Sequence, residues 1–124
     1  MMLFKKAINT TVYINEPLLI IQAVCNNKIC GKMICMINEE AKTISISDIE
    51  CQKNNKGYGS LMMKQLIEYA EQNRFECIDG WLSEVDRNHE KRLYYFYGKF
   101  GFKIIPNKEG MKFADIKLVL IDKR

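Results

Sequence analysis

The stretch Asn54-Asn55-Lys56-Gly57-Tyr58-Gly59-Ser60 lies between a β-like run, Thr43–Cys51, and a helix-like run over residues 60–73. Two glycines one residue apart lack the Cβ atoms that would hold an anion away, so successive backbone N–H groups can turn toward it. A helix that begins directly behind them adds its positive N-terminal end. A plain turn also uses two glycines, so the surrounding sequence must decide between a turn and an anion site.

The composition is that of an ordinary globular protein. Of the 124 residues, 48% are apolar and 27% are charged, which predicts one domain over residues 1–124 with a real core. No apolar run approaches the roughly 20 residues that span a bilayer. Lys5 and Lys6 are not followed by the apolar segment of a secretory signal. We therefore expect a cytoplasmic protein without a membrane partner.

The net charge and the cysteine spacing restrict which classes of ligand the protein is expected to bind. A net charge of +4 without a dense run of lysine and arginine favours an anionic ligand and gives nucleic acid only weak support. Five cysteines are an odd number, and none has the spacing of metal ligands. We expect reduced, mostly buried thiols and no metal site. The five are Cys25, Cys30, Cys35, Cys51 and Cys77.

The residues before the glycine stretch predict a β-rich half. Residues 11–14 fit a first strand, residues 18–25 and 29–37 fit a hairpin, and Thr43–Cys51 fits a further strand. Residues 4–8 fit either a strand or a helical turn. In the last strand the apolar alternation slips by one residue between Ser47 and Ile49, which indicates a β-bulge. The alternative is that the strand ends at Ser47.

After the helix over residues 60–73, a strand over residues 75–82 implies a parallel pair with a right-handed crossover. A loop at 83–87 leads to a second helix, with Asn88 as its expected N-cap and Gly101 at its end. Residues 102–105 and 113–120, joined by a turn at 106–110, predict a closing hairpin. The expected fold is a single α/β domain: a mixed, mainly antiparallel sheet with packed helices. A ligand is expected where the two parallel strands diverge.

Two other glycine-loop chemistries do not fit. A Walker loop needs a lysine and a serine or threonine that are not placed here, and a dinucleotide fingerprint needs a third glycine where the chain has Met62. The pattern Ile49-x-x-x-x-Asn54-x-x-Gly57-x-Gly59-Ser60-x-Met62 instead resembles the coenzyme A pyrophosphate loop of the GNAT acyltransferase superfamily. Further along, Phe96-Tyr97-Gly98-Lys99-Phe100-Gly101-Phe102 resembles that superfamily's Phe-Tyr-x-Lys-x-Gly-Phe signature. The resemblance covers about residues 43–120.

The resemblance implies a GNAT-like fold whose central parallel strands splay apart, with acetyl-CoA as the acyl donor. The chain departs from the family pattern at Asn54, where arginine or glutamine is usual. Lys53 and Lys56 would have to supply the missing interactions with the pyrophosphate. The two helices that the family usually has between its first and second strands have almost no room, so we expect a reduced amino-terminal helical region. Coenzyme A-binding residues are expected at Ile49, Cys51, Asn54, Asn55, Lys56, Gly57, Tyr58, Gly59, Ser60 and Asn88.

Amine acetylation needs a proton donor, an oxyanion site and a base. Tyr97 matches the family tyrosine and is the expected general acid, although the apolar stripe alone would make it a core residue. The backbone N–H of Ile49, beside the bulge, is the expected oxyanion donor. Asp48, Glu50 and Glu84 are candidate bases, with Glu50 preferred.

Other reactive side chains have simpler roles. His89, the single histidine, is expected to face solvent, and Cys51 to be a packed thiol, because the resemblance implies direct transfer. Trp81, Tyr94 and Tyr95 could line an acceptor pocket or simply pack.

The predicted function is transfer of an acetyl group from acetyl-CoA to a primary amine of a small molecule or protein. The alternative is a non-catalytic acyl-CoA-binding or partner-regulated module. The acceptor is not defined by the sequence, and a homodimer could complete its site.

Overall fold

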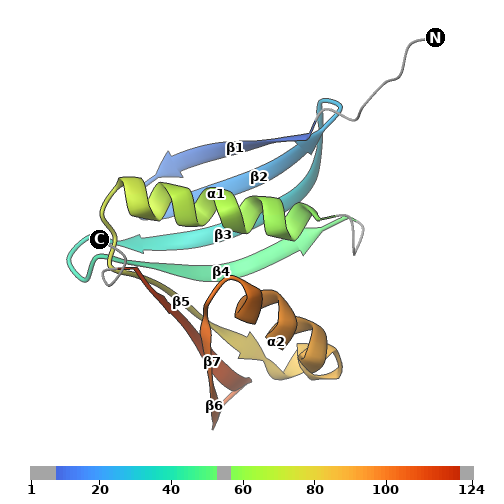
Figure 1. The fold of residues 1–124 in the computed structure, drawn as a ribbon, viewed down its shortest axis with the longest axis vertical. Coiled ribbons are helices and arrows are strands. Elements are labelled where there is room, and N and C mark those ends of the chain that lie inside the picture. Colours follow the sequence, from blue (N-terminus) through green and yellow to red (C-terminus); the bar gives the residue numbers. More distant parts are fainter. Residues whose placement is uncertain (1–7, 53–56, 121–124) are drawn as a thin grey trace.

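The structure is a computed structural model that describes residues 8–52 and 57–120. These residues form one mixed sheet of seven strands with two α-helices and a short 3-10 helix (Figure 1). The strands are β1 (Ile8–Asn15), β2 (Leu18–Cys25), β3 (Lys28–Asn38), β4 (Thr43–Cys51), β5 (Cys77–Ser83), β6 (Lys103–Glu109) and β7 (Lys112–Val119). The helices are α1 (Tyr58–Gln72), η1 (Glu84–His89) and α2 (Glu90–Lys99).

The strand order is β1-β2-β3-β4-β5-β7-β6, and every neighbouring pair except β4 with β5 is antiparallel. This confirms the mixed, mainly antiparallel sheet with a central parallel pair. β1 runs directly into β2 through residues 16 and 17, so no helix separates these two strands. The reduced amino-terminal helical region is therefore seen as a tight hairpin.

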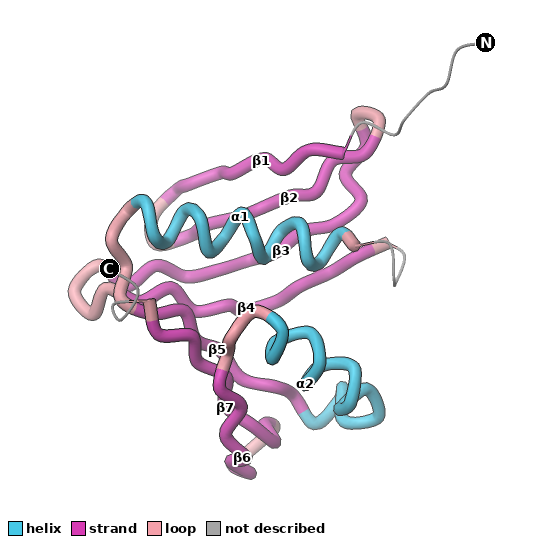
Figure 2. Tube along the Cα trace, viewed as in Figure 1, coloured by secondary structure: helices cyan, strands magenta, loops and turns pink. Residues whose placement is uncertain are grey.

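Both α-helices lie on the same side of the sheet, α1 across β2 and β3 and α2 beside β5 and β7 (Figures 1 and 2). Alternate side chains of the strands point to this side and are buried, as the period of two requires. α1 meets them with an apolar stripe, and burial of each large side chain stabilises the fold by about 1.5–3 kcal/mol. The stripe consists of Met62, Met63, Leu66 and Ala70.

The slip in the apolar alternation of β4 is a β-bulge, as predicted. Ile34 pairs with Asp48 while Cys35 pairs with Ile46, so Ser47 has no partner residue on β3. The extra residue puts Ile46 and Ile49 on the same side of the strand despite their odd separation. β4 therefore continues to Cys51 and does not end at Ser47.

Several boundaries differ from the predictions, among them the start of α1, the start of α2 and the end of β6. α1 begins at Tyr58, two residues early, because Gly57 takes a left-handed conformation with φ of 80° and caps the helix. Asn88 is not a helix N-cap: the expected loop is the 3-10 helix η1, capped by the Ser83 hydroxyl, and His89 precedes α2. β6 runs through Pro106 to Glu109, which an edge strand tolerates, so the turn comes at Gly110.

At the amino-terminal end, the strand predicted over residues 11–14 is the longer β1. The choice between strand and helical turn for residues 4–7 lies outside the described residues. Within the described part of the chain, neither helix has the length and apolar content needed to cross a membrane.

Gly98 is an exposed residue of α2, and a Cβ atom added to it would meet nothing within 4 Å. Gly98→Ala should therefore raise the free energy of unfolding by about 0.5–1 kcal/mol, because alanine loses less backbone entropy in a helix. Urea denaturation measures the change. The matched control is Gly101→Ala, which should destabilise, since Gly101 has φ of 93°. A loss of stability in both variants would contradict this account of α2.

Candidate active site

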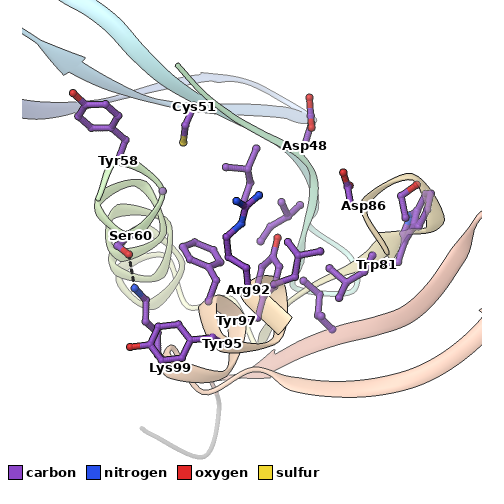
Figure 3. Close-up of a pocket in the computed structure, with 18 of the residues that line it drawn as sticks. Asp48, Cys51, Tyr58, Ser60, Trp81, Asp86, Arg92, Tyr95, Tyr97 and Lys99 are labelled. Carbon is purple, nitrogen blue, oxygen red and sulfur yellow. Dashed lines mark hydrogen bonds between the residues drawn. The ribbon is translucent and has the colours of Figure 1, made fainter. Parts of the chain in front are cut away.

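A cleft of about 690 Å³ opens on the helix side of the sheet, within the usual size range of small-molecule sites. It forms because β4 and β5 pair only from Thr43 to Ser45 and then separate. The diverging ends of the two strands form its walls, and the start of α1 and one face of α2 close its sides (Figure 3). This is where the sequence predicted a ligand.

The two positions at the start of α1 require glycine for different physical reasons. Gly57 supplies the left-handed turn and has open space around it. Gly59 is packed: a Cβ atom there would stand 3.3 Å from the Phe96 ring and 3.9 Å from the Cys51 sulfur. Gly59 therefore allows α1 to contact α2. The sequence had predicted only that the missing Cβ of Gly59 would leave room for an anion.

The first turn of α1 faces the cleft with Gly57, Tyr58, Gly59 and Ser60. The first N–H groups of a helix have no acceptor within the helix, and this turn has no side-chain cap and no acidic residue. It therefore offers donors and positive potential to an anion. The predicted contacts of Asn54, Asn55 and Lys56, and compensation by Lys53, lie outside the described residues.

Two cations of α2 also line the cleft. The Lys99 Nζ donates a 2.7 Å hydrogen bond to the Ser60 Oγ, which ties the end of α2 to the start of α1 (Figure 3). Arg92 has no hydrogen bond or ion pair within the described part of the chain, and Figure 3 shows its side chain extending into the cleft. The sequence reasoning missed Arg92, although it shares a helix face with Phe96 and Lys99 through spacings of four and three.

Tyr97 is 7% exposed and lines the cleft with its hydroxyl pointing into it (Figure 3). The hydroxyl has no hydrogen-bond partner among the described residues. Burial raises the pKa of Tyr97 well above its usual range, and the nearby groups Cys35, Asp86 and Asp48 raise it further. Tyr97 is thus a core residue whose hydroxyl stays protonated at neutral pH.

The candidate bases separate in space. Asp48 and Glu50 are both exposed, but only Asp48 borders the cleft. Glu50 pairs across the sheet with Lys32 and is absent from the cleft lining. Glu84 is held by Arg87 through a 3.0 Å ion pair that lowers the pKa of Glu84. Asp86, which the sequence reasoning did not single out, joins Asp48 in the cleft lining.

Ile49 and Cys51 line the same wall of the cleft, on the part of β4 that β5 no longer accompanies. Burial raises the pKa of the Cys51 thiol, as does the neighbouring Cys30, so Cys51 is a poor nucleophile at neutral pH. All five cysteines are free, two of them buried and three half-buried. Among the described residues, no group of His, Cys, Asp and Glu side chains could hold a metal ion.

Of the other residues that the sequence singled out, some line the cleft and others lie outside it. Trp81 and Tyr95 line the cleft, and they are 54% and 71% exposed. Tyr94 instead packs on Phe113 and donates a hydrogen bond to Glu90. Asn88 and His89 are exposed and lie outside this cleft lining.

With this geometry in view, comparison with known proteins assigns the family. The sequence pattern of the Acetyltransferase (GNAT) family matches residues 5–102, most of the chain. The chain belongs to the GNAT family. A curated relative, the uncharacterized protein YocC of Bacillus subtilis (strain 168), is 34% identical over 75 residues. That match spans 60% of this chain and 44% of YocC, so the chain spans less than half of this relative's length.

Solved structures confirm the GNAT fold. A PaiA N-acetyltransferase from Thermoplasma acidophilum, solved with coenzyme A, superposes with a TM-score of 0.70 at 13% identity, covering 84% of this chain and 62% of that one. An acetyltransferase from Bacillus subtilis, also solved with CoA, gives a TM-score of 0.70 at 15% identity, covering 94% of this chain and 100% of that one. The predicted splayed parallel strands and packed helices are thus confirmed.

The buried Tyr97 predicts how the stability of this GNAT protein depends on pH. Below about pH 10 tyrosine is protonated in both the folded and the unfolded chain. Above that pH the unfolded chain loses the proton first, because burial raises the pKa of Tyr97 in the fold. The native state then binds more protons, so the free energy of unfolding must fall as pH rises.

Urea denaturation between about pH 9 and 11 measures this effect, with wild type and Tyr97→Phe compared. Wild type should lose stability more steeply above about pH 10. Burial raises the pKa of Cys35 to about 12. The free energy of unfolding therefore also falls with pH because of Cys35, by the same amount in both proteins. Equal slopes in the two proteins would contradict the burial of Tyr97.

Proposed function

We propose that this protein transfers an acetyl group from acetyl-CoA to a primary amine. The observation that carries the proposal is the cleft between the diverging β4 and β5, which has an uncapped helix start at one end and the buried Tyr97 hydroxyl inside. The CoA complexes of two structural neighbours support the choice of donor.

The residues present suit the diphosphate of the donor. The first-turn N–H groups of α1 supply hydrogen bonds, and its helix end supplies positive potential. Lys99, held on Ser60, and Arg92 add full charges that the loop lacks at Asn54. The free edge of β4 beyond Ser45 offers backbone groups to the arm that carries the thioester. We also infer that Cys51 contacts this arm as a protonated thiol.

In the proposed reaction, the amine nitrogen attacks the thioester carbonyl carbon, the C–S bond breaks, and a new C–N bond forms. The Ile49 N–H would stabilise the oxyanion, as predicted beside the bulge. Tyr97 would give its proton to the departing thiolate. Its raised pKa keeps that proton in place until the thiolate forms.

The base is reassigned. Glu50 was preferred from the sequence, but it is exposed, pairs across the sheet with Lys32 and does not line the cleft. Asp48 is exposed but borders the cleft at the bulge and affects Tyr97 electrostatically, so we propose that Asp48 removes the proton of the acceptor ammonium through a water molecule. The base thus sits on the bulged part of β4.

One observation favours the non-catalytic alternative. The two-residue connection between β1 and β2 leaves out the helices that usually form part of the acceptor wall in this family. The acceptor side would then stay open, or a second copy of the chain would complete it. The proposed homodimer therefore bears on catalysis, whereas donor binding needs only one chain.

Calorimetry with CoA and thiol release from acetyl-CoA in the presence of an amine panel test the function. We expect CoA binding and turnover, with Tyr97→Phe lowering kcat by about 100-fold or more while CoA affinity changes little. Tyr69→Phe is the matched control, because Tyr69 lies on α1 outside the cleft lining. Absence of CoA binding at millimolar concentration would overturn the proposal, and binding without turnover on any amine would favour the non-catalytic module.

A further inference from the structure

The two edge strands of the sheet, β1 and β6, are built differently. β6 carries Lys103, Pro106, Lys108 and Glu109, and its pairing with β7 shifts in register after Pro106. Charges, prolines and bulges on an edge strand prevent it from pairing with a strand of another molecule. β1 has the sequence Ile-Asn-Thr-Thr-Val-Tyr-Ile-Asn, with no charge and no proline, and it pairs with β2 without a shift. β6 is therefore a protected edge and β1 is an open one.

β1 is also held firmly in place. All eight of its residues pair with β2, from Ile8 opposite Cys25 to Asn15 opposite Leu18. The Thr10 hydroxyl donates a 2.7 Å hydrogen bond to the side-chain oxygen of Gln65, which ties β1 to α1. About half of the backbone N–H and C=O groups of such a strand point away from its neighbour. Within residues 8–52 and 57–120, no strand lies on that side of β1 (Figure 1).

The side chains of β1 are apolar where they meet solvent. Ile8, Val12 and Ile14 are 40%, 39% and 46% exposed, and they share the helix side of the sheet with Thr10. Tyr13, on the other side, is 57% exposed. Antiparallel sheets normally present polar side chains to water. An uncharged edge strand with exposed apolar side chains indicates a surface that another chain covers.

We propose that β1 pairs antiparallel with β1 of a second copy of this chain and joins two seven-stranded sheets into one continuous sheet. The two-fold axis passes through Thr11, which meets the same residue of the partner. Thr10 then lies opposite Val12 of the partner, and Ile8 lies opposite Ile14 of the partner. These are pairs of β-branched residues, which favour strand pairing, and no charge meets a like charge.

The strand is complementary to itself, which selects a second copy as the partner. Antiparallel pairing about a two-fold axis gives the outward N–H groups of each copy the C=O groups of the other, and one surface serves both copies. The alternation is also kept, so Ile8, Val12 and Ile14 of both copies form one apolar strip on the helix side. Backbone and side chains thus point to the same arrangement.

The pairing leaves the candidate active site open. β2 and β3 separate β1 from β4, and no residue of β1, β2 or β3 lines the cleft among the described residues. This dimer therefore differs from one that completes the acceptor wall, and it goes beyond the proposed function. Each copy would bind CoA independently of the other.

Sedimentation of wild type and two matched variants tests the pairing. Wild type should be a dimer that dissociates on dilution. Val12→Lys should raise the dissociation constant of the dimer by about tenfold or more, because it brings two positive charges together at the interface. Ile105→Lys makes the same kind of change on β6, where Ile105 is 52% exposed, and should leave the dimer intact. Circular dichroism checks that both variants are folded.

Cysteine crosslinking tests the register without disturbing the charge. Residues directly opposite each other in an antiparallel pair have Cα atoms about 4.5–5.5 Å apart, which a disulfide can bridge. Under mild oxidation, Thr11→Cys should form a disulfide-linked dimer. Wild type should not, and neither should Asn9→Cys, because Asn9 lies opposite Tyr13 of the partner in this register. Crosslinking of Thr11→Cys no greater than that of wild type would overturn the axis at Thr11.

The outcomes separate this inference from the proposed function. A wild-type monomer at all concentrations, or a dimer that survives in Val12→Lys, would overturn pairing through β1. A monomer that binds CoA and transfers acetyl groups would overturn this inference alone. A dimer that Val12→Lys disrupts, but that binds no CoA, would support the pairing and overturn the proposed function.

Discussion

The site depends on the short parallel pairing between β4 and β5. Only residues 43–45 of β4 pair with β5, and beyond them the bulge at Ser47 redirects β4. A Cβ atom on Gly80 would stand 3.2 Å from the Ile46 carbonyl oxygen, so the strands pass closely just before they separate. The separation leaves one edge of β4 without a strand partner among the described residues and opens the cleft. A longer parallel ladder would close it.

The two sequence motifs of the family stabilise each other across this cleft. Gly59, in the first motif, lets the Phe96 ring of the second motif approach α1, and Lys99 bonds to Ser60 across the same junction. Phe96 also packs edge-on against Tyr97, so the helix junction and the proton donor share a contact. The motifs are 37 residues apart from Gly59 to Phe96, yet they form one structural unit. The proposed donor site and the proposed proton donor therefore belong to one packed unit.

The sequence predicted the parts of this structure that local chemistry determines. The alternation in β4, the two glycines and the aromatic signature sufficed for the parallel strand pair around the cleft and for the bulge. It did not predict that Glu50 would face away from the cleft, because a bulge changes which side chains share a face, and the site of the extra residue was known only to within two positions. Asp86 was missed because a 3-10 helix, where a loop was expected, places this exposed residue at the rim of the cleft.

The central claim is that the donor diphosphate binds at the start of α1 and its arm lies along the free edge of β4. Amide chemical shifts of the isotope-labelled protein, followed by NMR during a CoA titration, test it directly. The largest changes should fall on residues 57–60 and on Ile49 and Cys51, with smaller changes along α2 near Arg92. Largest changes on β1, the edge strand far from the cleft, or no changes at saturating CoA, would contradict the account.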